Sequence, residues 1–305
     1  MYRFMLCIIL MFSAAFSMEN TDTSTTLQKI LESKELVVGM HKADYPPFYF
    51  KKRISTIGDA VYGVIESNDS DDDPLVLIGQ NIDLAEGLGK KLGVKVRYVR
   101  EVLRFDDLVY DLMSGKTHVI ISHFSDTDKR RQIIDFSDTY LSSDVCLLAS
   151  PIRLKKHTDH LKLPPILYSR DFNQNFIKII ARDGSTHAET ARKAFQKASV
   201  YTIFNTQYDH LMACIEKGAF DATIGDELAL SIIFYRNPEG RKILQLYPLY
   251  PEDYEALGLT AKRDNIAIGI QKGSAELKNI INEYLKTVSF TPESIINDYV
   301  IGLGY

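Results

Sequence analysis

Ser125, Thr127 and Arg130 bring two hydroxyl groups and a guanidinium together within six residues, between an apolar strand and the start of a charged helix. The free backbone N–H groups at the start of a helix attract anions. A guanidinium adds a planar fork that binds a carboxylate through two parallel hydrogen bonds. We therefore expect the segment 118–138, which contains these residues, to hold a small carboxylate.

The elements around this segment alternate between strand and helix. Short apolar runs bounded by turn residues predict strands, and apolar positions three and four residues apart predict helices. Thr186 and Glu189 predict a capping box at the start of one helix. The pattern gives strands at 36–39, 94–99, 119–122, 177–181, 199–204, 222–224 and 266–271, and helices at 81–92, 105–113, 186–198, 207–217 and 275–288. This alternation predicts an α/β fold whose parallel sheets are flanked by helices.

Four chemically useful positions follow predicted strands: Tyr45, Ser125, Gly184 and Asp226. Ligands of such sheets bind beyond the carboxyl ends of the strands. We therefore expect these four positions to converge on one site.

Composition excludes several functions. The chain has 305 residues and a net charge of −4, without the basic face of a nucleic-acid-binding protein, so we expect no nucleic-acid partner. It contains neither a phosphate-binding loop nor a nucleophile elbow. His157 and His160 have helical spacing but no third metal ligand in view, so they are interpreted as a surface pair. We expect no cofactor and no metal.

Residues 1–17 have the features of a secretory signal peptide. Arg3 precedes an apolar stretch from Phe4 to Phe16, and small residues at Ala15 and Ser17 predict cleavage after Ser17. The alternative is an uncleaved anchor. We expect an exported, periplasmic protein.

Export makes a disulfide possible between Cys146 and Cys214. Their apolar settings favour two buried free thiols.

Residues 51–77 are expected to be irregular, and 68–74 to form a solvated acidic loop. This loop resembles a calcium loop, but Pro74 and Gln80 replace the glycine and the glutamate that such a loop needs.

An ordered set of motifs extends from residue 36 to residue 288. They are VG at 38–39, DYPPF at 44–48, IDLA at 82–85, KLG at 91–93, FDDL at 105–108, LMSG at 112–115, SDTDKR at 125–130, DFSDTY at 135–140, DGST at 183–186, GAFDA at 218–222 with Asp226, and GIQKGS at 269–274. In this order the chain resembles the extracellular solute-binding proteins, family 3, which are the amino-acid-binding proteins of ABC transporters.

The resemblance implies the two-lobed type II periplasmic-binding-protein fold, in which two sheets flanked by helices are joined by two hinge strands. Residues 26–143 plus 265–305 would form lobe 1, and 144–264 would form lobe 2. A ligand would bind in the cleft, and the lobes would close by a hinge motion. The implied partners are a small-molecule amino acid and a membrane permease, and the protein would act as a monomer.

By position in the motifs, the resemblance assigns ligand-binding roles. Arg130 would clamp the α-carboxylate, with donors from Thr127, Ser185 and Thr186. Ser125 and Asp226 would hold the ammonium group, and Tyr45 and Phe105 would form aromatic walls. Each has a structural alternative: Arg130 as a surface arginine, Ser185, Thr186 and Asp226 as helix caps, and Tyr45 and Phe105 as core aromatics.

Three positions depart from the family pattern. His123 stands where many members have glycine and is expected to narrow the pocket. Lys42 and Arg182 lie at positions that contact the ligand side chain in relatives. Two cations there would disfavour lysine or arginine and suit an acidic or polar side chain, unless both point into solvent.

A rival function on the same fold is a periplasmic cyclohexadienyl (prephenate or arogenate) dehydratase. Such an enzyme needs a general acid, and in that subfamily a glutamate stands three residues after the Asp226 position. Here that residue is Ala229, and the nearby Glu227 is expected to point elsewhere. We therefore expect a binding protein and not an enzyme.

Overall fold

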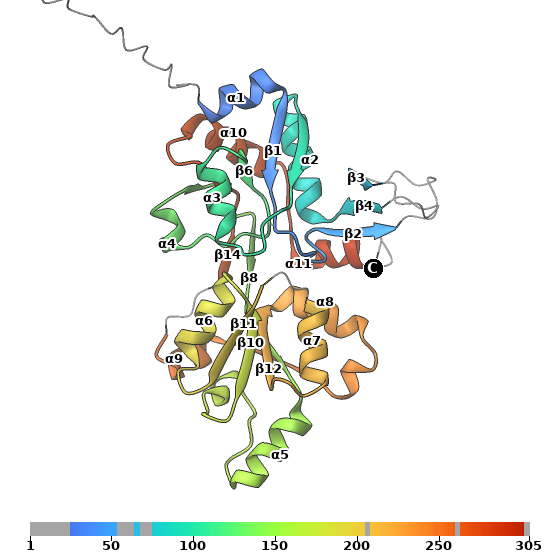
Figure 1. Cartoon of the computed structure of the whole chain (residues 1–305), viewed down its shortest axis with the longest axis vertical. Coiled ribbons are helices and arrows are strands. Elements are labelled where there is room, and N and C mark those ends of the chain that lie inside the picture. The colour runs from blue at the N-terminus through green and yellow to red at the C-terminus, as the bar shows by residue number, and fades with distance from the viewer. Residues whose placement is uncertain (1–24, 54–63, 68–74, 205–207, 260–262, 302–305) are drawn as a thin grey trace, which may run out of the picture.

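The computed structural model describes residues 25–53, 64–67, 75–204, 208–259 and 263–301. Two five-stranded sheets, one at each end of the molecule in Figure 1, form its framework. The first has the order β5(Lys95–Val99)-β1(Glu35–Gly39)-β6(Val119–Ile120)-β15(Gly269–Ile270)-β7(Asp135–Phe136). The second has the order β11(Ser199–Ile203)-β10(Lys178–Arg182)-β12(Ala222–Asp226)-β9(Val145–Ala149)-β13(Gln245–Pro248).

Both sheets share one construction. In each, a parallel trio, β5-β1-β6 or β11-β10-β12, is extended by strands that join through antiparallel pairs. The parallel trios follow the predicted strand–helix alternation, because a parallel pair needs a crossover connection. Of the strands that join antiparallel, only β15 returns from the C-terminal part of the chain; β7, β9 and β13 lie closer in sequence to the strands of their own sheets.

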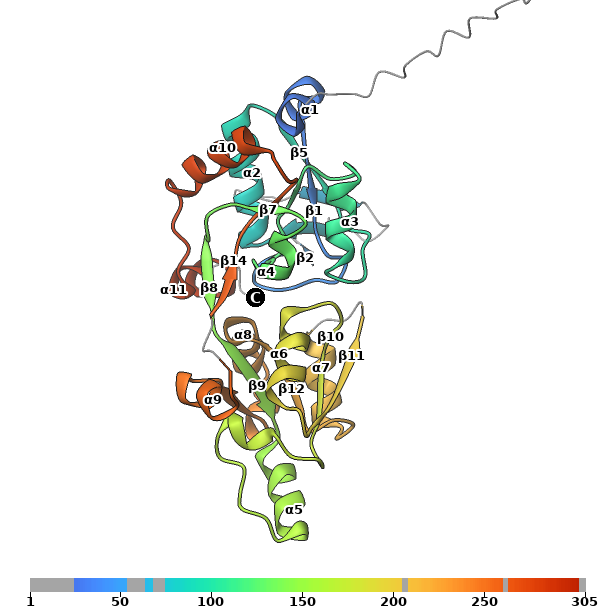
Figure 2. The same ribbon diagram turned by 90° about the vertical axis from the view of Figure 1, so that its left-hand side faces the viewer.

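Helices pack on the faces of both sheets (Figures 1 and 2). Those around the first sheet are α1(Thr26–Ser33), α2(Gln80–Leu92), α3(Asp107–Met113), α4(Asp128–Arg131), α10(Ala275–Leu285) and α11(Pro292–Ile295), which runs into the π-helix η3(Ile296–Ile301). Those around the second are α5(Pro151–Leu161), α6(Thr186–Ala194), α7(Tyr208–Glu216), α8(Glu227–Arg236) and α9(Pro251–Ala256), with the 3-10 turns η1(Ser169–Phe172) and η2(Gly240–Lys242).

Helix α2 illustrates how the sequence determines these elements. Leu84, Ala85 and Leu88 are buried with side chains of the first sheet, and Ile82 is also buried, as their spacing predicts. Gly93 ends the helix in the left-handed conformation, at a φ of 71°, and its N–H bonds to carbonyls of the last turn.

Two strands connect the lobes. β8(Leu141–Ser143) leads from the first sheet to the second, and β14(Asp264–Ile266) leads back; they pair antiparallel, between the lobes in Figure 2. The predicted two-lobed α/β fold with two connecting strands is therefore confirmed.

The segment 51–77 is more regular than expected. β2(Phe50–Arg53), β4(Leu75–Ile78) and β3(Val64–Ser67) form a small antiparallel sheet. Phe50, Val76 and Ile78 are buried together, which gives these short strands an apolar face that the charged sequence around them obscures. The expectation of an irregular segment was thus wrong for its described ends, and the acidic loop 68–74 lies outside the described residues.

Helix α6 also differs from expectation. Its N-cap is Ser185, whose hydroxyl accepts a hydrogen bond from the N–H of Ala188, so the capping box predicted for Thr186 and Glu189 is wrong by one residue. The helix ends at Ala194 and not at 198, because Phe195 is buried and leaves the helical conformation.

Other expectations concern the thiols and the N-terminus. Cys146 and Cys214 are both free; Cys146 is buried and Cys214 half-buried. The predicted signal peptide, residues 1–17, lies outside the described residues. Within the described part of the chain, no helix has both the length and the apolar character that crossing a membrane requires.

Candidate functional site

Side chains from both lobes meet at a small cavity between the two sheets. Its volume is about 20 Å³, which is room for about one water molecule. Its lining comes from loops and helix α4 of the first lobe, and from the end of β10 and the start of α6 in the second. The lining residues are Tyr45, Phe105, His123, Arg130, Arg182, Ser185, Thr186 and His187. The cleft is therefore closed in this structure, and a ligand larger than water requires the lobes to separate.

Arg130 is a buried cation on the first-lobe side of the cavity. It lies in α4, whose N-cap Thr127 accepts a hydrogen bond from the Arg130 N–H at 3.2 Å. The guanidinium lies over the Phe124 ring, 3.9 Å from its centroid, and donates to the carbonyls of Ser125 at 2.9 Å and Gly184 at 3.3 Å. Burial lowers the pKa of Arg130, and the carboxylate of Asp106 at 3.5 Å opposes this shift.

Arg182 approaches the same cavity from the second lobe. Its guanidinium carbon lies 4.6 Å from the centroid of the Tyr45 ring and 4.9 Å from that of Phe105. One nitrogen donates to Nδ1 of His41 at 3.3 Å. A cation from the second lobe thus occupies the space beside the two aromatic walls of the first.

His41 was missed by the sequence analysis. Its ring stacks on Phe105, with 4.7 Å between centroids, and its Nδ1 accepts a hydrogen bond from the Ala43 N–H at 3.1 Å. Burial and the charge of Arg182 lower the pKa of His41 to about 3, so the ring is neutral, with its proton on the Nε2 that faces the Leu103 carbonyl at 3.0 Å. The unprotonated Nδ1 of His41 is therefore a neutral hydrogen-bond acceptor for the guanidinium of Arg182.

Lys42 does not belong to this cluster, because its side chain is exposed. The preceding residue, His41, lies in the cluster instead, in contact with Arg182 and Phe105.

His123 and Asp226 form a buried contact between the lobes. Nε2 of His123 lies 3.0 Å from Oδ2 of Asp226, and both side chains are almost fully buried. Asp226 also caps α8 by accepting a hydrogen bond from the Ala229 N–H at 2.9 Å. Burial raises the pKa of Asp226, but His123 and the hydrogen bonds outweigh burial and hold this pKa below its ordinary value.

Ser125 of the first lobe and Thr186 of the second lobe contact each other. Their hydroxyl oxygens are 3.0 Å apart, and both donate to Oδ2 of Asp264, at 2.8 and 3.1 Å. His187 lies 3.6 Å from the same carboxylate, and its pKa is lowered by burial. Asp264 and His187 were not singled out in the sequence, because their partners come from distant parts of the chain.

Two predicted residues have mainly local contacts. The Ser185 hydroxyl caps α6 and donates to the Arg182 carbonyl at 2.7 Å, while Ser185 also borders the cavity. Thr127 caps α4 and borders a neighbouring cavity of about 330 Å³, which Thr186, Arg263 and Asp264 also line.

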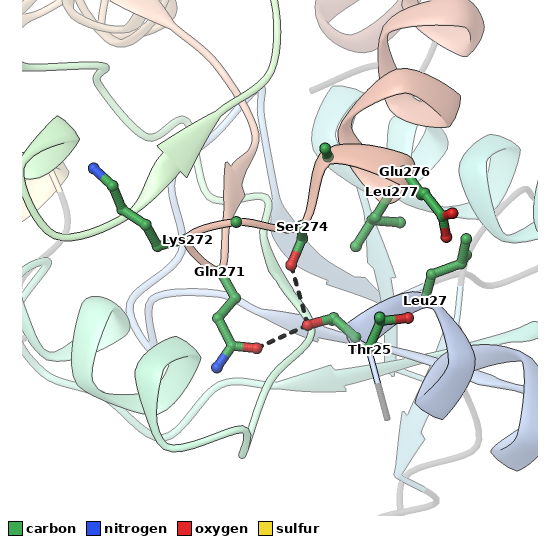
Figure 3. Close-up of a pocket in the computed structure, with 10 residues that line it drawn as sticks. Thr25, Leu27, Gln271, Lys272, Ser274, Glu276 and Leu277 are labelled. Carbon is green, nitrogen blue, oxygen red and sulfur yellow. Dashed lines mark hydrogen bonds between the residues drawn. The ribbon is translucent and has the colours of Figure 1, made fainter. Parts of the chain in front are cut away.

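Further cavities lie outside the cleft. One of about 270 Å³ lies between the starts of α1 and α10 (Figure 3). There, Thr26 donates to Oε1 of Gln271 at 2.7 Å and accepts from Ser274 at 3.2 Å, so these three polar side chains pair with one another.

A cavity of about 420 Å³ behind the connecting strands is lined by Glu227 with Asp144, Tyr250, Tyr254 and Arg263, among others. Glu227 therefore lies outside the lining of the cleft cavity, as expected.

His157 contacts Asp221 at 3.1 Å, and no metal-binding cluster of histidine, cysteine or acidic residues occurs within the described residues.

Two sheet-based lobes with a closed polar cleft between them define a two-lobed solute-binding protein. The chain belongs to the bacterial extracellular solute-binding proteins, family 3, whose sequence profile matches residues 66–293.

Curated relatives align over most of the chain. The lysine/arginine/ornithine-binding periplasmic protein of Escherichia coli K12 is 28% identical over 85% of this chain and 91% of its own length. The histidine-binding periplasmic protein of the same strain is 24% identical over 84% of this chain and 90% of its own. Both are named as binding proteins.

Solved structures share the fold. The substrate-binding protein AbpA of Streptococcus pneumoniae, bound to L-arginine, has a TM-score of 0.66 at 22% identity, covering 89% of this chain and 96% of that one. An ancestral amino acid-binding protein described as a precursor of cyclohexadienyl dehydratase has a TM-score of 0.66 at 23% identity, covering 90% and 99%.

Proposed function

We propose that this protein captures an amino acid with an acidic or polar side chain in the interlobe cleft and delivers it to an ABC importer. The observation that carries the proposal is the pair of buried arginines, Arg130 and Arg182, which face one cavity from opposite lobes. A guanidinium binds a carboxylate through two parallel hydrogen bonds. Two guanidinium groups beside one cavity therefore suit a ligand that brings two carboxylates, or a carboxylate and a polar group.

Arg130 would bind the α-carboxylate. Its fork is buried, and the start of α6 at Ser185 and Thr186 lies across the cavity from it. Together they offer a guanidinium and the free N–H groups of a helix start to one anion. Asp226 would then face the ligand's ammonium group.

Arg182 would select the ligand side chain. The curated relatives are named for lysine, arginine, ornithine or histidine. A cationic side chain between Tyr45 and Phe105 would meet the guanidinium of Arg182, which already lies over both rings. Like charges repel strongly in a site closed to water. This argues for an acidic or polar side chain in this chain, although the relatives bind basic ones.

The wider setting follows from the family. The protein would be exported with cleavage near Ser17 and would act in the periplasm as a monomer with a membrane permease as its partner. Residues 26–143 plus 265–305 would move as lobe 1 and 144–264 as lobe 2, with the hinge at β8 and β14.

A thermal-shift screen tests this function, because a ligand that binds only the folded state raises its apparent stability. We expect glutamate, aspartate or their amides to raise the melting temperature, and lysine and arginine to leave it unchanged. A shift with the basic amino acids alone would contradict the assignment of Arg182. No shift with any amino acid would contradict the proposed function.

A further inference from the structure

We propose that two ion pairs between the lobes, Arg104–Asp183 and Lys129–Glu189, stabilise the closed cleft and thereby raise ligand affinity without contacting the ligand. These four residues lie outside the lining of the cleft cavity. The inference rests on the proposed function of the cleft as a ligand site. It goes beyond that function by assigning a role to residues that the ligand does not touch.

Both ion pairs join the lobes with the same polarity. Nε of Arg104 lies 2.9 Å from Oδ2 of Asp183, and Nζ of Lys129 donates to Oε1 of Glu189 at 3.2 Å. In each pair the cation belongs to the first lobe and the carboxylate to the second. Helix α4, which carries Lys129, lies above α6, which carries Glu189, in both views of the molecule (Figures 1 and 2). The opposite charges therefore attract the two lobes toward each other.

The Arg104–Asp183 pair lies directly beside the ligand site. Arg104 precedes Phe105 in the chain and Asp183 follows Arg182, and the Arg182 guanidinium carbon lies 4.9 Å from the centroid of the Phe105 ring. The two turns also approach closely through their backbones, because a Cβ atom at Gly184 would lie only 3.2 Å from the Phe105 nitrogen. Formation of this ion pair therefore accompanies the assembly of the wall that Phe105 and Arg182 form.

The interlobe ion pairs contribute to the closed state alone. The lobes must separate to admit a ligand, and separation breaks both pairs, so their energy favours closing. Exposed pairs contribute little. The Asp183 side chain is only 25% exposed, whereas those of Lys129 and Glu189 are 67% and 44% exposed. We therefore expect Arg104–Asp183 to have the larger effect.

Small-angle X-ray scattering measures closure without any added ligand. Asp183→Arg places two cations opposite each other, and we expect a larger radius of gyration than in the wild type at low salt. Adding Arg104→Asp to this variant restores the opposite charges in exchanged positions and should restore the wild-type radius. Glu35→Arg is the matched control, because Glu35 pairs with an arginine of similar exposure within the first lobe, Arg97 at 2.8 Å. It should leave the radius unchanged.

Isothermal titration with L-glutamate measures the effect on affinity. We expect Arg104→Gln and Asp183→Asn each to weaken binding about two- to fivefold, as the loss of a partly exposed ion pair does. The double variant should be no weaker than the weaker single variant, because both changes remove the same contact. Glu35→Gln should bind as the wild type does.

The direction of the Asp183→Asn effect distinguishes the ion pair from a general change of charge. Removing a negative charge beside the cleft would by itself strengthen the binding of an anionic side chain. Loss of the interlobe contact weakens binding instead. Stronger binding by Asp183→Asn would therefore overturn the inference.

The remaining outcomes separate the inference from the proposed function. Coupling between Arg104 and Asp183 in either measurement supports the inference. Equal radii in the wild type and Asp183→Arg, without coupling in the titrations, overturn it, and glutamate binding in that case leaves the proposed function intact. If charge exchange restores the radius but no amino acid binds, the proposed function fails and the role of the ion pair stands. An increased radius that Arg104→Asp does not reverse, again without coupling in the titrations, also overturns the inference.

Discussion

Arg182 lies against Tyr45 across the cleft, with 4.6 Å between its guanidinium carbon and the ring centroid. The arginine ends a strand of the second sheet, and the tyrosine follows a strand of the first. The contact therefore exists only when the lobes are closed. It links the ligand preference of the cleft to its closure, since a ligand side chain and Arg182 must share the space beside Tyr45.

Replacing Arg182 tests the selection of the side chain. Arg182→Leu removes the cation beside the aromatic walls while keeping an apolar side chain there. We expect affinity for acidic ligands to fall by about tenfold or more and binding of lysine or arginine to appear, measured by isothermal titration. Arg192→Leu changes an exposed arginine on α6. It should bind acidic ligands with wild-type affinity and should still not bind lysine or arginine. Equal affinities in Arg182→Leu and the wild type would rule out this role.

Replacing Arg130 tests its proposed role in binding the ligand carboxylate. Arg130→Ala removes a buried guanidinium that reaches the cavity, and losing such a charge-assisted contact costs about 2–5 kcal/mol. We expect a loss of affinity of more than about tenfold for every carboxylate ligand, determined by titration. Arg131→Ala is the matched control, because the neighbouring arginine is half-exposed and pairs with Asp126. Wild-type affinity in Arg130→Ala would exclude the clamp.

The buried His41 gives stability a pH dependence. Its pKa in the folded protein is about 3, against 6.5 as its ordinary value. Between these values the unfolded chain binds a proton that the folded protein does not, so the free energy of unfolding falls as the pH falls below 6.5. One such group contributes about 1.4 kcal/mol per pH unit in this window.

Urea unfolding of the wild type and of His41→Gln between pH 7.5 and pH 5 measures this contribution. The variant lacks the titrating ring, so its stability should fall less steeply with acid. His160→Gln, a change in a histidine at the exposed end of α5, is the control. Identical slopes in His41→Gln and the wild type would show that His41 is not held neutral by the fold.

The cleft should not catalyse the dehydratase reaction. Ala229 stands where a general acid would be needed, and Glu227 lines a different cavity, behind the connecting strands. Incubation with prephenate or arogenate should therefore give no aromatic product above the uncatalysed rate. Turnover at an enzyme-like rate would identify the protein as an enzyme.

Much of the architecture could be predicted from local sequence. The strand at 36–39, the helix that ends at Gly93 and the turn at Ser125–Arg130 all follow from apolar spacing and capping residues. The small sheet of β2, β3 and β4 could not, because its strands are only four residues long and none of their sequences, FKKR, VIES and LVLI, alternates between apolar and polar residues.

Most residues of the site could be predicted from the sequence, but the contacts between them could not. His123 was expected to narrow the pocket; its contact with Asp226, 103 residues away, depends on how the lobes close. His41 was missed because its partner Arg182 lies 141 residues away in the sequence, in the other lobe. Asp264 was missed for a different reason: it lies in the returning connection, 139 residues from Ser125.

The most direct test of the central claim is isothermal titration of the purified protein with L-glutamate and, separately, with L-lysine. The arrangement of Arg130 and Arg182 around one cavity predicts saturable, one-to-one binding of glutamate and no measurable binding of lysine. Binding of lysine without glutamate would contradict the account, because it would place a cationic side chain where Arg182 lies.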